Sequence, residues 1–138
     1  MEYKVFNDKI ILKISRGDDV LDSLALVTKL EKITFATFEA IGAIEEVSLG
    51  YLKEDGKYLI KEFNGDWELV SLKGSVAGNE EIHAHAIISG SDFIAKGGHF
   101  FGGVVSGVVE MVITNITNEK IEKVQKEEDL FPTWNLEK

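Results

Sequence analysis

All three histidines of this 138-residue chain fall between His83 and His99. His83 and His85 are separated by one residue in a segment that alternates as a β-strand does. Since side chains at i and i+2 of a strand point to the same face, these two rings should point the same way. A metal ion with ring nitrogens at about 2.0–2.1 Å suits such a pair. His99 follows a turn and a glycine pair, so it can return to complete a three-histidine metal site.

The ordinary alternative is that His83 and His85 are core histidines satisfied by hydrogen bonds and that His99 is a loop residue. If a metal is bound, three protein ligands leave one position for water, which is the catalytic rather than the structural arrangement. Glu68 and Glu110 fall in otherwise apolar strands, so either could be a fourth ligand or an acid–base catalytic group. A carboxylate in such a position is more often a paired buried acid or a surface-facing residue.

The composition limits what could hold an ion and what the chain could bind. The chain has no cysteines, so imidazole, carboxylate, backbone or water must supply the ligands. The formal charge is −9, and Arg16 is the single arginine among fifteen basic residues. Nucleic-acid binding depends on basic patches, so it is not expected of the isolated chain. The glycine pairs match no nucleotide-binding motif, so no organic cofactor is expected.

One helix and many short strands should position the histidines. Asp19 is a helix cap, and apolar residues recur at helical spacing from Val20 to about Lys32. Asn7-Asp8 and Glu54-Asp55-Gly56-Lys57 are hairpin turns. Gly42, Asn64-Gly65-Asp66 and Gly74 are interpreted as strand ends. The predicted strands are Tyr3–Phe6, Ile10–Ser15, Thr34–Ile41, Val47–Lys53, Tyr58–Phe63, Trp67–Lys73, Ile82–Ile88, Phe93–Lys96, Phe101–Thr114 and, as an edge strand, Lys120–Val124.

This order of elements predicts a single α+β domain, with a mainly antiparallel sheet and one main helix packed on it. Residues 1–125 should form the domain and residues 126–138 a C-terminal tail, ordered by docking on itself or on a neighbouring subunit. No apolar region follows a basic start at the N-terminus, so a signal peptide is not expected. The apolar run Phe100–Ile113 is too short to span a bilayer. We therefore expect a cytoplasmic protein without membrane contact.

Several short motifs occur in an order that resembles a known family. They are Arg16-Gly17-Asp18-Asp19-Val20, Ala40-Ile41-Gly42-Ala43, Leu49-Gly50-Tyr51, Trp67 to Gly74, His83-Ala84-His85, Gly97-Gly98-His99 and Glu110. Over residues 3–115 the chain resembles the plant and prokaryote conserved domain, also called DUF296 or the PD1-like domain. The fold of that family is similar to acetolactate decarboxylase and to a family of zinc-dependent ester hydrolases.

The resemblance implies a half-barrel-like sheet, a homotrimer, and zinc on His83, His85 and His99. It also places Arg16 as a candidate group for a small anionic ligand. Plant members carry an AT-hook, and prokaryotic members are often labelled as DNA-binding proteins, but the Arg-Gly-Arg-Pro core of that hook is absent here. The expected function is a zinc-binding homotrimeric module. The alternatives are a zinc hydrolase or lyase acting on a small carboxylate or ester, and a DNA-binding or regulatory protein.

Overall fold

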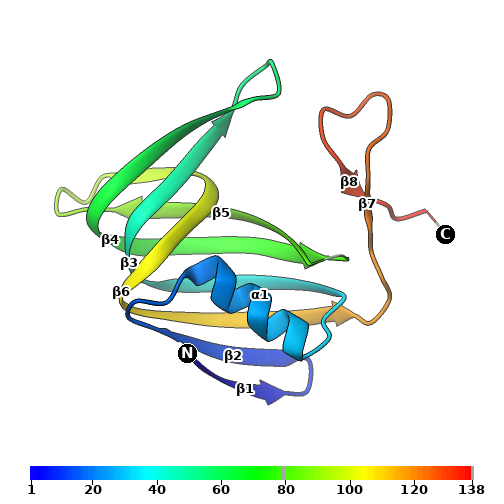
Figure 1. Ribbon diagram of the computed structural model, residues 1–138, viewed down its shortest axis with the longest axis horizontal. Helices are drawn as coiled ribbons and strands as arrows, with labels where there is room; N and C mark the ends of the chain where they lie inside the picture. Colours follow the sequence, from blue (N-terminus) through cyan, green and yellow to red (C-terminus); the bar gives the residue numbers. More distant parts are fainter. Residues whose placement is uncertain (79, 138) are drawn as a thin grey trace.

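The computed structural model describes residues 1–78 and 80–137. One helix and eight strands follow one another along these residues (Figure 1): β1 (Glu2–Phe6), β2 (Lys9–Ser15), α1 (Val20–Leu30), β3 (Phe35–Leu52), β4 (Tyr58–Ala77), β5 (Glu81–Ser89), β6 (Ala95–Thr117), β7 (Lys123–Val124) and β8 (Thr133–Trp134). Within these ranges, no helix has the length and apolar character needed to cross a membrane.

The main sheet is antiparallel and partly closed on itself. Its strand order is β1-β2-β6-β3-β4-β5, and β5 pairs in addition with β6. The first residues of β6 pair with β5, whereas residues Val108 to Thr114 pair with β2. The long β6 strand therefore belongs both to a closed ring of β3, β4, β5 and β6 and to an open sheet that continues to β1. This arrangement confirms the predicted α+β fold with a half-barrel-like sheet.

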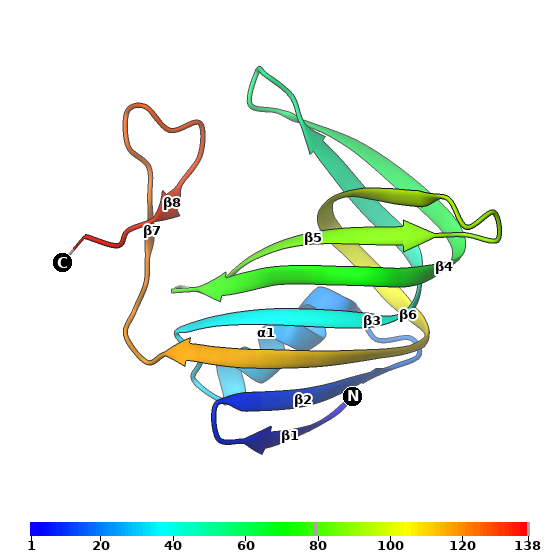
Figure 2. The ribbon, with the colours of Figure 1, turned by 180° about the vertical axis from the view of Figure 1, so that it is seen from behind.

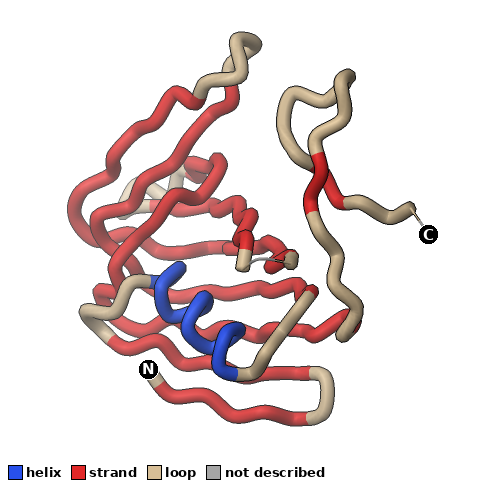
Figure 3. Tube along the Cα trace, turned by 45° about the vertical axis from the view of Figure 1, so that its right-hand side comes forward, coloured by secondary structure: helices blue, strands red, loops and turns tan. Residues whose placement is uncertain are grey.

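The helix α1 covers one face of the open part of the sheet. It stands in front of the strands in Figure 1 and behind them in Figure 2. Its apolar stripe is fully buried against side chains of β2 and β6; the buried residues there include Val20, Leu24, Val27, Leu12, Ile14, Val105 and Val109. Figure 3 shows this helix on one side of the strands. No helix among the described residues covers the opposite face of the sheet.

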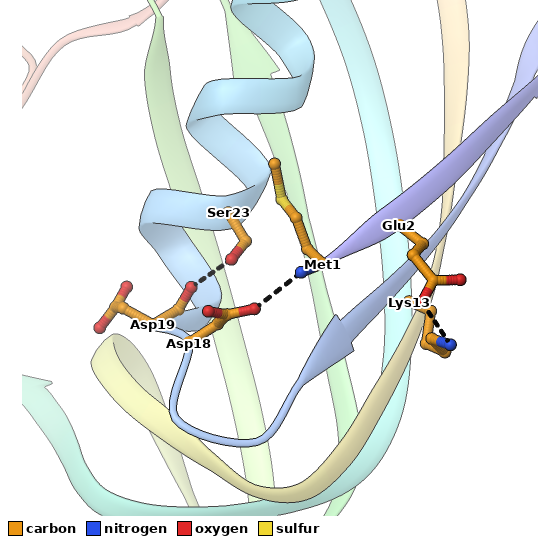
Figure 4. A network of polar contacts seen from close by, with 6 residues as sticks. All are labelled: Met1, Glu2, Lys13, Asp18, Asp19 and Ser23. Atoms are coloured by element: carbon orange, nitrogen blue, oxygen red, sulfur yellow. Dashed lines mark hydrogen bonds and ion pairs between the residues drawn. The ribbon is translucent and has the colours of Figure 1, made fainter.

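The start of α1 is fixed by polar contacts with the beginning of the chain (Figure 4). The Asp19 side chain accepts a hydrogen bond from the Asp22 backbone N–H at 2.9 Å, which caps the helix as predicted. The Ser23 hydroxyl donates to the Asp19 carbonyl at 2.7 Å, and the Met1 ammonium lies 3.0 Å from an Asp18 carboxylate oxygen. These contacts attach β1 to the helix N-terminus.

The predicted strand end at Gly42 is wrong, because β3 runs without a break from Phe35 to Leu52. The register of β3 against both neighbours shifts at this point, which makes Gly42 a β-bulge. A Cβ atom at position 42 would lie 2.1 Å from the Val108 carbonyl oxygen. Only glycine allows β6 to approach here, so this residue marks a bend inside a strand and not its end.

Two further pairs of predicted strands are also continuous. Asn64-Gly65-Asp66 lies inside β4, opposite a register shift of β3 between Glu45 and Val47, and β4 continues through Gly74 to Ala77. The predicted strands Phe93–Lys96 and Phe101–Thr114 are parts of β6, with Phe93 in the turn before it. In β4 both flanking segments pair with the same neighbour, β3, whereas in β6 the pairing passes from β5 to β3 within one continuous strand. In both strands the turn-like residues make a bulge or bend and do not reverse the chain.

The C-terminal segment forms its own small sheet. β7 pairs with β8 and is not an edge strand of the main sheet, which corrects the prediction for Lys120–Val124. The Gly78 N–H donates to the Ile121 carbonyl at 2.8 Å, and the rings of Phe35 and Trp134 meet edge to face at 5.2 Å. The segment after residue 117 thus folds partly on itself, as Figure 1 shows, and contacts the domain through Gly78 and Phe35.

Candidate metal centre

The three histidines come from two neighbouring strands. His83 and His85 lie on β5, and His85 is the direct register partner of His99 on β6. Directly opposed residues of antiparallel strands have Cβ atoms about 4.5–5.5 Å apart and point to the same face. Alternate positions of β5, Ala84, Ala86 and Ile88, are buried in the core. The pleat of β5 therefore turns all three imidazoles to the face away from the core.

One ligand atom from each of the three rings lies within 4.8 Å of the others. The ring centroids are 5.1 Å apart for His83 and His85, 5.2 Å for His83 and His99, and 5.5 Å for His85 and His99. His83 and His99 are half-buried and His85 is exposed. The face of β5 that carries the histidines is therefore only partly buried, whereas the opposite face is in the core.

The donor set and its spacing fit a transition-metal ion. Two nitrogens bound at about 2.0–2.1 Å to one tetrahedral ion are about 3.4 Å apart. The 4.8 Å limit found here exceeds that separation by about 1.4 Å, which small rotations of the three rings can close. Imidazole nitrogen suits zinc, copper, iron and nickel better than magnesium or calcium, which prefer oxygen. The group can therefore hold a metal ion, although the identity of the ion does not follow from geometry.

Tyr58 fixes the orientation of His99. The Tyr58 hydroxyl lies 3.3 Å from Nδ1 of His99, and the two rings are 4.9 Å apart. If Nδ1–H donates to the tyrosine oxygen, the lone pair of Nε2 is free to bind a metal. A hydrogen bond to the second ring nitrogen is how proteins usually set the tautomer of a ligating histidine. Tyr58 is therefore a positioning residue for the site.

Charge and burial around the triad favour neutral imidazoles. Burial, followed by the positive charges of His83, His85 and Lys123, lowers the pKa of His99 to about 4. Burial is also the main cause that lowers the pKa of His83, assisted by Lys123 and His85 and opposed by Glu81. A metal binds only unprotonated imidazole, so these two rings are in the binding form at neutral pH.

The triad lies in the wall of a cavity of about 770 Å³. The β3–β4 hairpin contributes Tyr51, Leu52 and Tyr58 to its lining, and β5 contributes Glu81 and Ile82. Gly50 and Gly98 lie beside the histidines, and the C-terminal segment contributes Lys123, Phe131, Pro132, Thr133 and Trp134. Clefts of roughly 300–1,000 Å³ are typical of small-molecule sites. The arrangement can thus bring a small ligand next to the three imidazoles.

The other residues singled out from the sequence lie elsewhere. Glu110 pairs with Lys13 on β2 and lines a separate hollow on the uncovered face of the sheet, together with Glu39 and Lys73. Glu68 is exposed on β4, opposite Ala43 and Ser89. Arg16 is exposed ahead of the helix. None of these three lines the histidine cavity. Within one chain they do not meet the triad, and a catalytic role for Glu68 or Glu110 stays a prediction.

Sequence reasoning missed Tyr58 and Lys123. Tyr58 lies 41 residues before His99 in the sequence. It is the first residue of β4, directly after the β3–β4 turn, and this turn places it beside His99. The sequence predicts Lys123 in an edge strand, where a lysine side chain usually points to solvent, so nothing in the pattern indicates a role at the histidine site. A signal for Tyr58 was present in the hairpin turn that precedes it, but nothing local connects that turn to the histidines.

Residues 1–117 match the family model of the Plants and Prokaryotes Conserved (PCC) domain, and the chain belongs to this family. A candidate DNA-binding protein of Bacteroides thetaiotaomicron is 25% identical, with a TM-score of 0.92 and coverage of 99% of this chain and 98% of that one. The metal-containing protein AF0104 of Archaeoglobus fulgidus is 26% identical, with a TM-score of 0.85 and coverage of 97% and 96%.

The structural likeness extends beyond the family. Acetolactate decarboxylase of Bacillus subtilis has a TM-score of 0.58 at 16% identity, over 78% of this chain and 52% of that one. At this identity the likeness concerns the fold alone. A comparison with curated protein sequences finds no match. The expected family and the expected relation to the decarboxylase fold are confirmed.

Proposed function

We propose that this chain is a zinc-binding module that works as a homotrimer, with zinc held by His83, His85 and His99. The observation that carries the proposal is the convergence of three imidazoles from two paired strands. The neutral state of His83 and His99 and the contact from Tyr58 support it, because both prepare ring nitrogens for an ion. The name of the Archaeoglobus fulgidus protein, a metal-containing relative of the same fold, agrees with it.

Metal analysis of protein purified without a histidine tag tests this proposal. We expect about one equivalent of zinc per chain after incubation with the ion and removal of the excess. His85→Ala should reduce the uptake to less than about a tenth of an equivalent, because two imidazoles bind far more weakly than three. Ile87→Ala is the matched control, since Ile87 is two residues further on the same strand and is 42% exposed. Equal uptake by wild type and His85→Ala would reject the triad.

The homotrimer is supported by the uncovered face of the sheet. Large apolar side chains are exposed there, including Ile11, Ile41 and Val112, of which Ile41 is 58% exposed. Light scattering should give three times the chain mass for wild type and for Leu30→Lys, an exposed position on the helix. Ile41→Lys should dissociate the trimer, because it places a charge in the apolar contact. A monomeric wild type would contradict the proposal.

A second candidate function is a zinc-dependent hydrolase or lyase that acts on a small carboxylate or ester. The cavity beside the triad favours it, since three protein ligands leave room for a substrate. A bound zinc would supply Lewis acidity there. Tyr58 would orient His99, and the C-terminal segment would exclude water from the cavity. Metal-dependent turnover of esters or of 2-oxo and 2-hydroxy acids, lost in His85→Ala, is the required result.

A third candidate is DNA binding, which the name of the Bacteroides protein supports and the formal charge of −9 opposes. The test is binding to A·T-rich duplex at about 0.15 M salt, where contacts to phosphate still give measurable affinity. No binding at micromolar protein would reject this function for the chain alone.

A further inference from the structure

The C-terminal segment places one lysine inside the histidine cavity. The side chain of Lys123 is only 11% exposed, whereas those of Lys120 and Lys126, in the same segment, are 56% and 49% exposed. Its ammonium lies 3.1 Å from the Glu81 carboxylate, and Glu81 precedes His83 on β5. Lys123 also lines the same cavity as the three histidines. Lys123 is therefore a half-buried cation beside the triad.

The position of Lys123 is fixed by the contacts of its neighbours. The carbonyl of Ile121 accepts a backbone hydrogen bond from Gly78, and Lys123 pairs with Trp134 across the two-stranded sheet. The Trp134 ring meets Phe35, a core residue, edge to face. These contacts hold β7 and β8 on the domain, so the lysine belongs to a built wall of the cavity.

The charges of the cavity lining lead to a preference for anions. Among the described residues that line the cavity, the ionised side chains are those of Glu81 and Lys123. Their opposite charges neutralise each other in an ion pair. A divalent ion on three neutral imidazoles would thus keep its full charge of +2 with no carboxylate to offset it. An uncompensated charge in a partly covered site favours binding of a counter-ion. A small anion is the natural occupant.

The remaining lining indicates which anion. Phe131, Pro132 and Trp134 form the side of the cavity that the tail supplies, and Leu52 and Ile82 add apolar surface from the strands. A ligand with an anionic end toward the triad and Lys123, and an apolar part under the tail, complements both sides. A carboxylate has two oxygens, so one can face the open side of the triad while the other accepts from an ammonium.

We propose that Lys123 and the apolar residues of the C-terminal segment bind a small organic carboxylate with an apolar substituent next to the histidine triad. The inference rests on the proposed metal site and adds the class of ligand and the residues that select it. Lys123 recognises the carboxylate, Glu81 holds Lys123 in place, and Phe131 with Trp134 covers the apolar part.

Calorimetric titration of benzoate into the full chain tests this inference, with the protein both metal-free and loaded with Co²⁺ as a visible substitute for zinc. We expect benzoate to bind the loaded protein and benzamide, its neutral analogue, to bind about tenfold more weakly or not at all. Lys123→Met should weaken benzoate binding about tenfold, the loss of one charge-assisted hydrogen bond, without changing cobalt uptake. Lys126→Met is the matched control, because Lys126 forms an exposed ion pair with Glu137 in the same segment.

Two further variants separate the charged and the apolar contributions. Glu81→Gln removes the charge that neutralises Lys123 but keeps a side-chain oxygen that can accept its hydrogen bond, so it should tighten benzoate binding. Phe131→Ala should weaken benzoate binding about fivefold and leave acetate unaffected, since only the apolar contact is lost. Leu136→Ala is its control, because Leu136 is 69% exposed and outside the cavity lining. Thermal unfolding of each variant verifies that it is folded.

The outcomes distinguish this inference from the proposed function. One equivalent of cobalt with no benzoate binding, equal binding of benzoate and benzamide, or equal effects of Lys123→Met and Lys126→Met would overturn the inference alone. Absence of cobalt uptake by wild type would overturn the metal site. In that case, carboxylate recognition would still be supported if benzoate bound to the metal-free wild type and not to Lys123→Met. No binding of benzoate to the metal-free wild type would overturn both the metal site and the inference.

Discussion

His85 and His99 face each other directly across the β5–β6 ladder, so two of the three candidate ligands are held by backbone pairing. The third, His83, is on the same face of β5 two residues earlier. Because the register of an antiparallel pair fixes which side chains are opposed, a slip of one residue would turn His99 to the other face. The geometry of the triad therefore depends on the sheet and not on a loop.

Tyr58→Phe should lower metal affinity about 10- to 100-fold, because it removes the hydrogen bond that orients His99 while keeping the ring. Competition with a chromophoric chelator measures the affinity. Tyr51→Phe is the control, since Tyr51 also lines the cavity but is 70% exposed. Unchanged affinity in Tyr58→Phe would mean that packing of the strands alone orients His99.

The stability of the metal-free protein should decrease as the pH falls from about 6.5 to about 4. The pKa of His99 is about 4 in the fold, against an ordinary value of 6.5. Between these values the unfolded chain binds a proton that the folded chain does not, so protonation favours unfolding. Denaturant titrations at about pH 7 and about pH 5, with chelator present, measure the effect.

His99→Gln is the comparison for that titration, because it removes the titrating group and leaves the carboxylates unchanged. The variant should lose less stability than wild type over the same pH interval. Parallel losses in the two proteins would show that other groups account for the pH dependence.

Gly98→Ala should impair both stability and metal binding. A Cβ atom at position 98 would lie 2.6 Å from the Gly50 carbonyl oxygen, so β3 and β6 would have to separate next to His99. The free energy of unfolding should fall by about 1–3 kcal/mol, as for overpacked interiors. Gly103→Ala on the same strand is the control, since its nearest contact would be 3.4 Å. Equal stability of the two variants in denaturant would contradict this.

Asp19→Ala should lower the free energy of unfolding by about 1 kcal/mol and leave metal affinity unchanged. The variant loses the cap on the Asp22 N–H at the start of α1, and Asp19 does not line the histidine cavity. Chemical denaturation and chelator competition give the two values. A loss of metal affinity would reveal a coupling through β6, because the Val105 N–H donates to the Asp18 carbonyl on the strand that carries His99.

The sequence predicted the local features well, because their signals are local. The cap at Asp19, the hairpin turn at Asn7-Asp8 and the shared face of His83 and His85 each depend on a few adjacent residues. The histidine pair follows from the two-residue period of a strand, and the return of His99 follows from the turn before it.

The long strands could not be predicted in the same way. Gly42 and Asn64-Gly65-Asp66 have the composition of chain reversals, and only pairing of both flanks with the same neighbour shows that they are irregularities within strands. Lys123 and Tyr58 were missed for a related reason. Each reaches the histidines through a contact between segments that are distant in the sequence, and no periodic pattern encodes such a contact.

The β6 strand joins the ring that carries the triad to the sheet that holds the main core. Its first residues cannot separate from β5 and β3 without disturbing the residues that pair with β2 further along. An ion bound to His99 would therefore be thermodynamically linked to unfolding of the whole domain. Saturation at a hundred times the dissociation constant would add about 2.7 kcal/mol to global stability, and the melting temperature of the protein would report on the concentration of its ligand.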